Sequence, residues 1–116
     1  MSAQEKEVAR LSKGAIPAYA LPATGNTVTV TNTAQTIEQL LAVIPLPIPD
    51  TAIMARLQFE GDPVRMWENG VPTISEGLLM SDGVIYDLDI RPNFEQARFI
   101  LASGSSSATI QIQFYR

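Results

Sequence analysis

Apolar and polar residues alternate with a period of two in three segments of the chain after residue 26. Residues 27–31 alternate strictly, and residues 52–60 place Ile53, Ala55, Leu57 and Phe59 on one face with polar residues and Met54 on the other. Residues 108–115 repeat the pattern up to Tyr115. This period is typical of strands that are buried on one side. Further strand signals occur at 64–68, 77–80, 84–88 and 97–102.

Turn residues separate these strands. Gly61-Asp62-Pro63 predicts a turn, and Asn69-Gly70 predicts a type I′ hairpin because both residues tolerate positive φ. Asp82-Gly83 has the same chemistry and predicts a second hairpin, between residues 77–80 and 84–88. The Ser- and Gly-rich residues 103–107 predict the tip of a third hairpin near the end of the sequence.

Residues 36–44 fit two patterns. Ile37, Leu40, Leu41 and Ile44 have helical spacing, but the surrounding strands favour another strand. We therefore expect about eight strands and no second helix beyond the one predicted near residue 1. An all-β, antiparallel, jelly-roll-like sandwich over residues 27–116 is the predicted fold.

Residues 1–26 differ in kind and predict an extended N-terminal arm that carries a short helix. Ser2 and Glu5 have the spacing of a capping box, and Val8 and Leu11 fall on one helical face. The prolines in residues 16–25 favour an extended conformation. Because so short a helix is marginal unless it docks, we expect Val8 and Leu11, together with Tyr19, either to contact a partner or to stay mobile.

The amino-acid composition bears more on the expected function than on the expected fold. The 116 residues, 12.6 kDa in mass, suit one domain, and they include neither cysteine nor histidine. Disulfides and thiolate metal sites are thereby excluded, and the commonest residues of hydrolytic and redox catalysis are missing. We expect a protein that is not an enzyme and binds no cofactor, although carboxylates, tyrosines and arginines remain.

Charge and hydropathy narrow the partners. The eight Lys and Arg against twelve Asp and Glu give −4, divided as 3 − 2 = +1 in residues 1–26 and 5 − 10 = −5 in the remainder. An acidic body disfavours nucleic acid and an anionic membrane surface. The charged start and the prolines in the apolar run 42–49 predict neither a signal peptide nor a membrane span. We expect a soluble protein made in the cytoplasm.

Three carboxylates, Asp82, Asp87 and Asp89, are close enough in sequence to suggest a calcium site. Their spacing lacks the EF-hand series and its closing Glu, so a turn Asp and two solvated strand carboxylates are the favoured interpretation. We predict no metal site. Residues 104–107 resemble a phosphate loop but lack its Lys and following helix.

Aromatic residues supply the remaining candidates. Glu68 and Glu76 lie near Trp67, as in a carbohydrate site with paired carboxylates, although solvated loop acids are commoner. Phe99 and Phe114 are predicted to lie in the core. Trp67 and Tyr115 face away from their apolar neighbours in the predicted strands, so we expect them to contact a partner.

Five segments of residues 50–116 taken together resemble small accessory virion proteins of tailed bacteriophages, namely residues 61–67, 70–73, 77–83, 97–100 and 110–116. An Arg-plus-aromatic strand, a Pro-Thr after a hairpin, a Gly-hydrophobic strand, an Ala-Arg-Phe-Ile strand and a closing strand occur there in the family's order. The resemblance covers roughly residues 50–116.

This resemblance implies a structural virion protein that decorates or cements the capsid through contacts with the major capsid protein. A tail, collar or head–tail adaptor protein is the alternative, and a carbohydrate-binding module is the second alternative. For a capsid-bound sandwich a closed homo-oligomer, favoured to be a trimer, is expected. The expected location is the virion.

Overall fold

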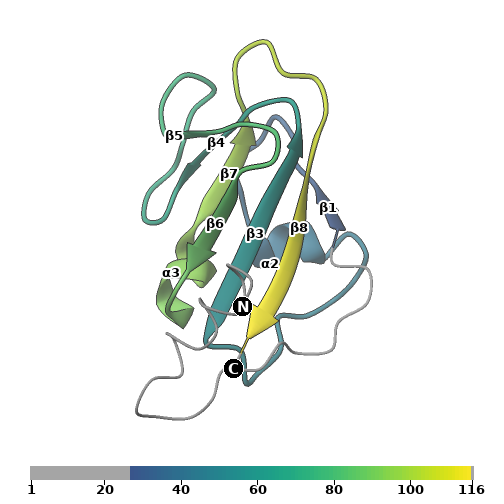
Figure 1. Ribbon diagram of the computed structural model, residues 1–116, viewed down its shortest axis with the longest axis vertical. Helices are drawn as coiled ribbons and strands as arrows, with labels where there is room; N and C mark the ends of the chain where they lie inside the picture. Colours follow the sequence, from purple (N-terminus) through teal and green to yellow (C-terminus); the bar gives the residue numbers. More distant parts are fainter. Residues whose placement is uncertain (1–26, 116) are drawn as a thin grey trace, which may run out of the picture.

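The computed structural model describes residues 27–115, which form two antiparallel four-stranded sheets and two short helices (Figure 1). The predicted all-β fold with about eight strands is confirmed. The predicted arm and its helix lie outside the described residues. In chain order the elements are β1 (Thr27–Thr29), β2 (Gln35–Thr36), α2 (Ile37–Leu41), β3 (Met54–Gly61), β4 (Val64–Trp67), β5 (Leu78–Met80), β6 (Ile85–Leu88), α3 (Arg91–Gln96), β7 (Arg98–Leu101) and β8 (Ala108–Tyr115).

The strand order is that of a jelly roll. One sheet has the order β1-β8-β3-β6 and the other has the order β2-β7-β4-β5. The strands pair as β1 with β8, β2 with β7, β3 with β6 and β4 with β5. Successive pairs in this series belong to alternate sheets, as in a long hairpin folded over itself. The β3–β8 and β4–β7 ladders complete the two sheets. This arrangement is the double Greek key predicted from the sequence.

The core lies between the two sheets and is apolar. The rings of Phe59 on β3 and Phe99 on β7 are 6.1 Å apart between centroids and link the sheets. Phe94 of α3 packs edge-on against Phe114 of β8 at 5.9 Å, so this helix covers one end of the core. No polar or charged residue among residues 27–115 is buried. The core is therefore held by packing, as the absence of cysteine required.

Two residues depart from the predicted faces of β3, namely Ile53 and Met54, which was placed with the polar residues but is 1 % exposed. The strand begins at Met54, and the Ile53 side chain is 54 % exposed while Ala55, Leu57 and Phe59 are buried as predicted. The alternating pattern of the sequence extends beyond the start of the strand, but burial against the opposite sheet does not extend as far. Pattern alone therefore extended the inner face by one residue too many.

Residues 36–44 were predicted to be a strand, and this is wrong. Only Thr36 belongs to a strand, and α2 follows it directly. The Thr36 hydroxyl accepts a hydrogen bond from Gln39 N at 3.2 Å, while the Gln39 side chain accepts one from Thr36 N at 2.8 Å. This capping box satisfies two backbone donors at the start of the helix and orients Ile37, Leu40 and Leu41 into the core.

The helix α3 also contradicts the prediction that residues 27–116 contain no helix. Its first turn contains Pro92, whose missing N–H costs nothing at that position. Phe94 is fully buried and anchors it. The helix is too short for its single buried residue to produce a readable period.

Two of the three predicted hairpins are wrong, and the one between β4 and β5 has a longer loop than predicted. Among the described residues only glycines have positive φ, so Asn69-Gly70 does not form a type I′ turn. It lies in a long loop between Trp67 and Leu78, closed by the Met66–Leu78 pair. The connections containing Asp82-Gly83 and residues 103–107 pass from one sheet to the other rather than joining paired strands. Turn chemistry predicts where the chain reverses, but not which strand it then pairs with.

Candidate functional site

The edge strands β5 and β6, one from each sheet, lie on the same side of the molecule (Figure 1), and large apolar side chains of β4, β5, β6 and the loop between β4 and β5 are exposed. Their exposed fractions run from 38 % for Trp67 to 60 % for Val71. We call this surface the apolar flank, made of Trp67, Val71, Ile74, Leu78, Leu79 and Ile85. Large apolar residues grouped in this way on a small domain are characteristic of protein interaction surfaces.

A glycine fixes the direction in which β5 begins. Gly77 has φ 132°, and a Cβ there would lie 3.1 Å from Met66 O and 3.2 Å from Pro72 Cβ. The Arg65 guanidinium donates to Gly77 O at 2.9 Å and holds the backbone in place. The close return of the chain places β5 along β4, so that Leu79, paired with Arg65, points outward.

The loop between β4 and β5 is tied down at two points. Thr73 and Glu76 exchange backbone hydrogen bonds of 2.9 and 3.3 Å, and Ser103 N donates to Ile74 O at 2.8 Å. Pro72 is buried beneath the loop, while Val71 and Ile74 stay exposed. The loop is thus an ordered support that presents apolar side chains to solvent.

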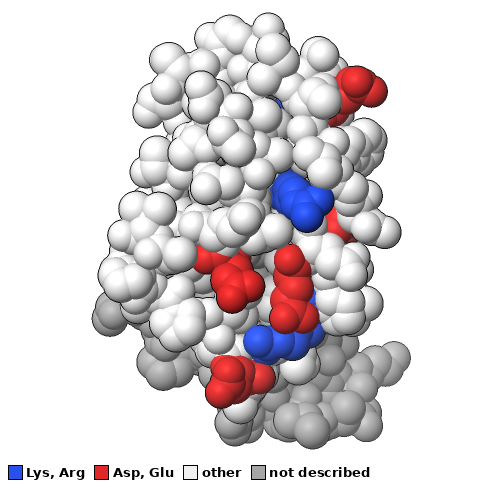
Figure 2. Space-filling model, turned by 180° about the vertical axis from the view of Figure 1, so that it is seen from behind, with Lys and Arg blue, Asp and Glu red and all other residues white. Residues whose placement is uncertain are grey.

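The edges of this flank carry no lysine, while β5 is only three residues long and β6 contains Asp87. Edge strands are commonly guarded by lysine, but both lysines of the chain, Lys6 and Lys13, lie outside residues 27–115. The three residues of β5 are all uncharged. Figure 2, seen from behind, shows the charged side chains mostly in the lower and middle parts of the molecule, with acidic atoms also at the upper right edge of an otherwise largely uncharged upper part. An edge strand without charge, such as β5, favours pairing with another chain.

The predicted partner residues have different outcomes. Trp67 faces outward from β4, between buried Met66 and half-buried Glu68, as predicted. Tyr115 also points away from Phe114, but it is only 2 % exposed, and the prediction that it is available at the surface is wrong. The Arg56 guanidinium lies 5.8 Å from the centroid of the Tyr115 ring, which helps to cover it.

Val8, Leu11 and Tyr19, the other predicted partner residues, lie outside the described residues, and their contact with a partner stays a prediction. Of the apolar flank, the sequence identified Trp67 alone. Leu78 and Leu79 carried a readable signal, because two adjacent exposed leucines break the alternation expected of a half-buried strand.

The acidic residues near Trp67 are engaged with neighbours. Tyr86 of β6 donates a hydrogen bond to Glu68, and partial burial together with the negative charges of Glu68 and Asp89 raises the pKa of the Tyr86 hydroxyl. This contact joins the end of β4 to an edge strand of the other sheet. Glu76 is exposed in the loop, where its backbone bonds to Thr73.

The three aspartates considered for calcium do not converge. Asp87 forms a bidentate ion pair with Arg56, both hydrogen bonds being 2.8 Å long, and Asp82 accepts from Gly61 N at 2.9 Å. Within residues 27–115 no group of three or more acidic residues is placed to hold a metal ion. These carboxylates act on the fold, by joining β3 to β6 and to the connection that follows β5.

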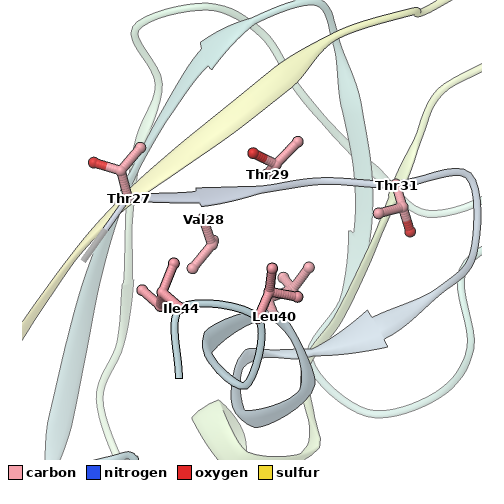
Figure 3. Close-up of a pocket in the computed structure, with 7 residues that line it drawn as sticks. Thr27, Val28, Thr29, Thr31, Leu40 and Ile44 are labelled. Carbon is pink, nitrogen blue, oxygen red and sulfur yellow. The ribbon is translucent and has the colours of Figure 1, made fainter. Parts of the chain in front are cut away.

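A second apolar feature lies on the opposite flank, between the edge strand β1 and α2. It is a pocket of about 140 Å³ (Figure 3). Val28 and Leu40 form its buried floor, and Val43 and Ile44, which are 81 % and 38 % exposed, form its rim. Figure 3 shows Val28, Leu40 and Ile44 facing the space between the strand and the helix, while Thr27 and Thr29 point away from it.

Comparisons with protein-family models, with curated proteins and with solved structures found no significant match to this chain. None of the helices within residues 27–115 is long and apolar enough to cross a membrane. The two apolar surfaces and the strand order are therefore the features from which a function can be inferred.

Proposed function

We propose that this chain is a structural virion protein of a tailed bacteriophage, and that it decorates or cements the capsid through protein–protein contacts. The observation that carries the proposal is the apolar flank, where exposed side chains accompany edge strands without lysine. The eight-stranded jelly roll is one of the architectures used by viral capsid domains, and lectins use it as well. The sequence resemblance to accessory virion proteins supports the first of these uses.

Two contributions would stabilise an assembly at this surface. The side chains of the apolar flank release water on contact, at about 25 cal/mol for each Å² of apolar area buried. The open backbone of an edge strand adds hydrogen bonds if a strand of the partner pairs with it. An ordered loop loses little conformational entropy on contact, since Ile74 is already held through Ser103. We propose a closed homotrimer on the major capsid protein.

Counting the copies of this chain per particle tests the location and the role together. Quantitative mass spectrometry of purified phage particles, with labelled peptides of this chain as standards, is expected to give copies in the tens to hundreds, in multiples of three, as order-of-magnitude numbers for a symmetric shell. A dozen copies or fewer would instead indicate a collar, tail or head–tail adaptor. Absence of the chain from the particles would refute the virion role.

A carbohydrate-binding role is the second candidate. Trp67 is 38 % exposed and directly precedes Glu68, and an exposed aromatic ring beside a carboxylate suits a sugar. A glycan array read with the full chain and with Trp67→Ala distinguishes the two functions. Glycan binding that the substitution abolishes would support this candidate, and an array without signal would remove it.

A further inference from the structure

We propose that the pocket between β1 and α2 is a docking site for residues 16–22 of a second copy of this chain, a segment whose prolines predict an extended conformation. The inference rests on the proposed function, since it supplies one contact by which copies assemble. The pocket is separate from the apolar flank, because β1 and β6 are the opposite edges of the same sheet.

The outer backbone of β1 is not paired with any strand of residues 27–115. Val28 lies opposite Ile110, and Val30 N donates to Ala108 O at 3.0 Å. In an antiparallel ladder the hydrogen-bonded pairs alternate, so Val28 and Val30 direct their backbone groups toward β8, and Thr29 directs its own away from the sheet. An extended segment can therefore add to this edge as a further strand.

The side chains beneath this edge suit an apolar strand. A strand added beside β1 would place alternate residues over α2, where Val43 and Ile44 are exposed next to the buried Val28 and Leu40. No charged residue lines the pocket. A space of about 140 Å³ is large enough for one branched aliphatic side chain and excludes a segment with a charged residue at that position.

The segment before Thr27 has the required properties. The chain has 26 residues there, and residues 16–22 are Ile-Pro-Ala-Tyr-Ala-Leu-Pro, without charge. Pro17 and Pro22 enclose four residues that can pair, which matches the length of residues 27–30, and proline is tolerated at the ends of a strand and on edges. The region 1–26 carries +1 against −5 for the remainder, so its charge also favours the acidic body.

Register favours a second copy over the same chain. With Leu21 opposite Val28 in an antiparallel pair, Pro22 lies opposite Thr27. In a hairpin within one chain, this is the pair that closes the turn, and proline has no N–H to donate to it. A segment that arrives from another copy has no turn to close, and it loses only a bond at the end of the strand. Leu21 then fills the pocket of its neighbour.

Cysteine cross-linking tests this contact directly, because the natural chain has no cysteine. Full-length chains carrying Leu21→Cys and chains carrying Val43→Cys, one of them labelled with ¹⁵N, are mixed, dissociated, reassembled and oxidised. Glu38→Cys is the matched control, since it is an exposed position on α2, the helix that directly precedes the turn containing Val43. The mass of the disulfide-linked pair identifies links between the two different chains.

We expect the mixed disulfide with Val43→Cys to form several-fold more than the one with Glu38→Cys, at twice the 12.6-kDa chain mass. Equal yields would overturn the inference. A chain carrying both Leu21→Cys and Val43→Cys that closes the link within itself would also overturn it, in favour of its own segment. If these links fail while light scattering still shows an oligomer, the docking site alone is wrong; a monomer contradicts the proposed function.

Discussion

Removing the Thr36 hydroxyl is expected to destabilise the protein through α2. The helix has five residues, so most of its backbone N–H groups belong to the first turn and depend on capping. Thr36→Ala removes the acceptor of the 3.2 Å bond from Gln39 N. Loss of an N-cap costs about 1 kcal/mol, within a range of about 0.5–2 kcal/mol. Burial of Ile37 and Leu41 still holds the helix in place, so we expect loss of stability rather than loss of fold.

Urea denaturation followed by the fluorescence of Trp67, the single tryptophan, measures this change. We expect Thr36→Ala to lower the free energy of unfolding by about 1 kcal/mol. The corresponding fall in Tm is about 4 °C for a domain of this size. Thr36→Ser keeps the hydroxyl and is expected to retain most of the stability. A loss below about 0.2 kcal/mol for alanine, or equal losses for both variants, would refute the capping argument.

The remaining predictions concern the core and the connection between β3 and β4. Leu57→Ala is expected to cost about 2–5 kcal/mol in urea denaturation, because the side chain is fully buried between the sheets, and a cost below 1 kcal/mol would contradict its core position. Gly61→Ala is expected to lower Tm clearly, because φ is 94° and the new Cβ would lie 2.8 Å from Ser107 O; an unchanged Tm would contradict that geometry. Asp62 accepts hydrogen bonds from Ser106 N and Ser107 N, which lower the pKa of its carboxyl below 3.8. The contribution of the Asp62 carboxylate to stability is therefore present above its unfolded pKa and is lost as the pH falls through its folded pKa. We expect Asp62→Asn to weaken the pH dependence of stability below about pH 4. Identical stability–pH profiles for the wild type and Asp62→Asn would contradict this.

The sequence correctly predicted those strands that have one face buried against the opposite sheet along their whole length. Residues 27–31 and 108–115 alternate as the structure requires, because one face of each meets the opposite sheet. Residues 37–41 could not be assigned in this way, since Ile37, Leu40 and Leu41 fit a strand context and a helical period equally. The capping box formed by Thr36 and Gln39 was a local signal that favoured the helix.

Partner strands and surface cover were harder to predict. Residues 103–107 have loop chemistry in either topology, so nothing local distinguishes a hairpin from a crossing between sheets. Tyr115 points away from the core as its alternation predicted, yet Arg56 on the neighbouring strand lies over its ring. Arg56 is 59 positions earlier in the chain, 115 − 56, and only the β3–β8 register brings the two together. Cover of this kind depends on tertiary pairing and has no period in the sequence.

The exposure of the apolar flank was also hard to predict from the sequence. Leu79 is exposed because β5 is an edge strand, and edge position follows from the strand order rather than from the residues of β5. The composition led us to expect an assembly module, whereas the surface that we propose for assembly could be located only from the sheet topology.

The most direct test of the central claim is the mass of the protein in solution with and without a charge on the apolar flank. Native mass spectrometry of the full-length wild-type chain is expected to show a closed oligomer of the 12.6-kDa subunit, favoured to be a trimer. Leu79→Lys, at a side chain that is 50 % exposed, is expected to yield mainly monomer with unchanged Tm, while Thr51→Lys in an exposed turn stays assembled. A wild-type chain that is monomeric at micromolar concentration, or an oligomer that Leu79→Lys leaves intact, would contradict assembly through the apolar flank.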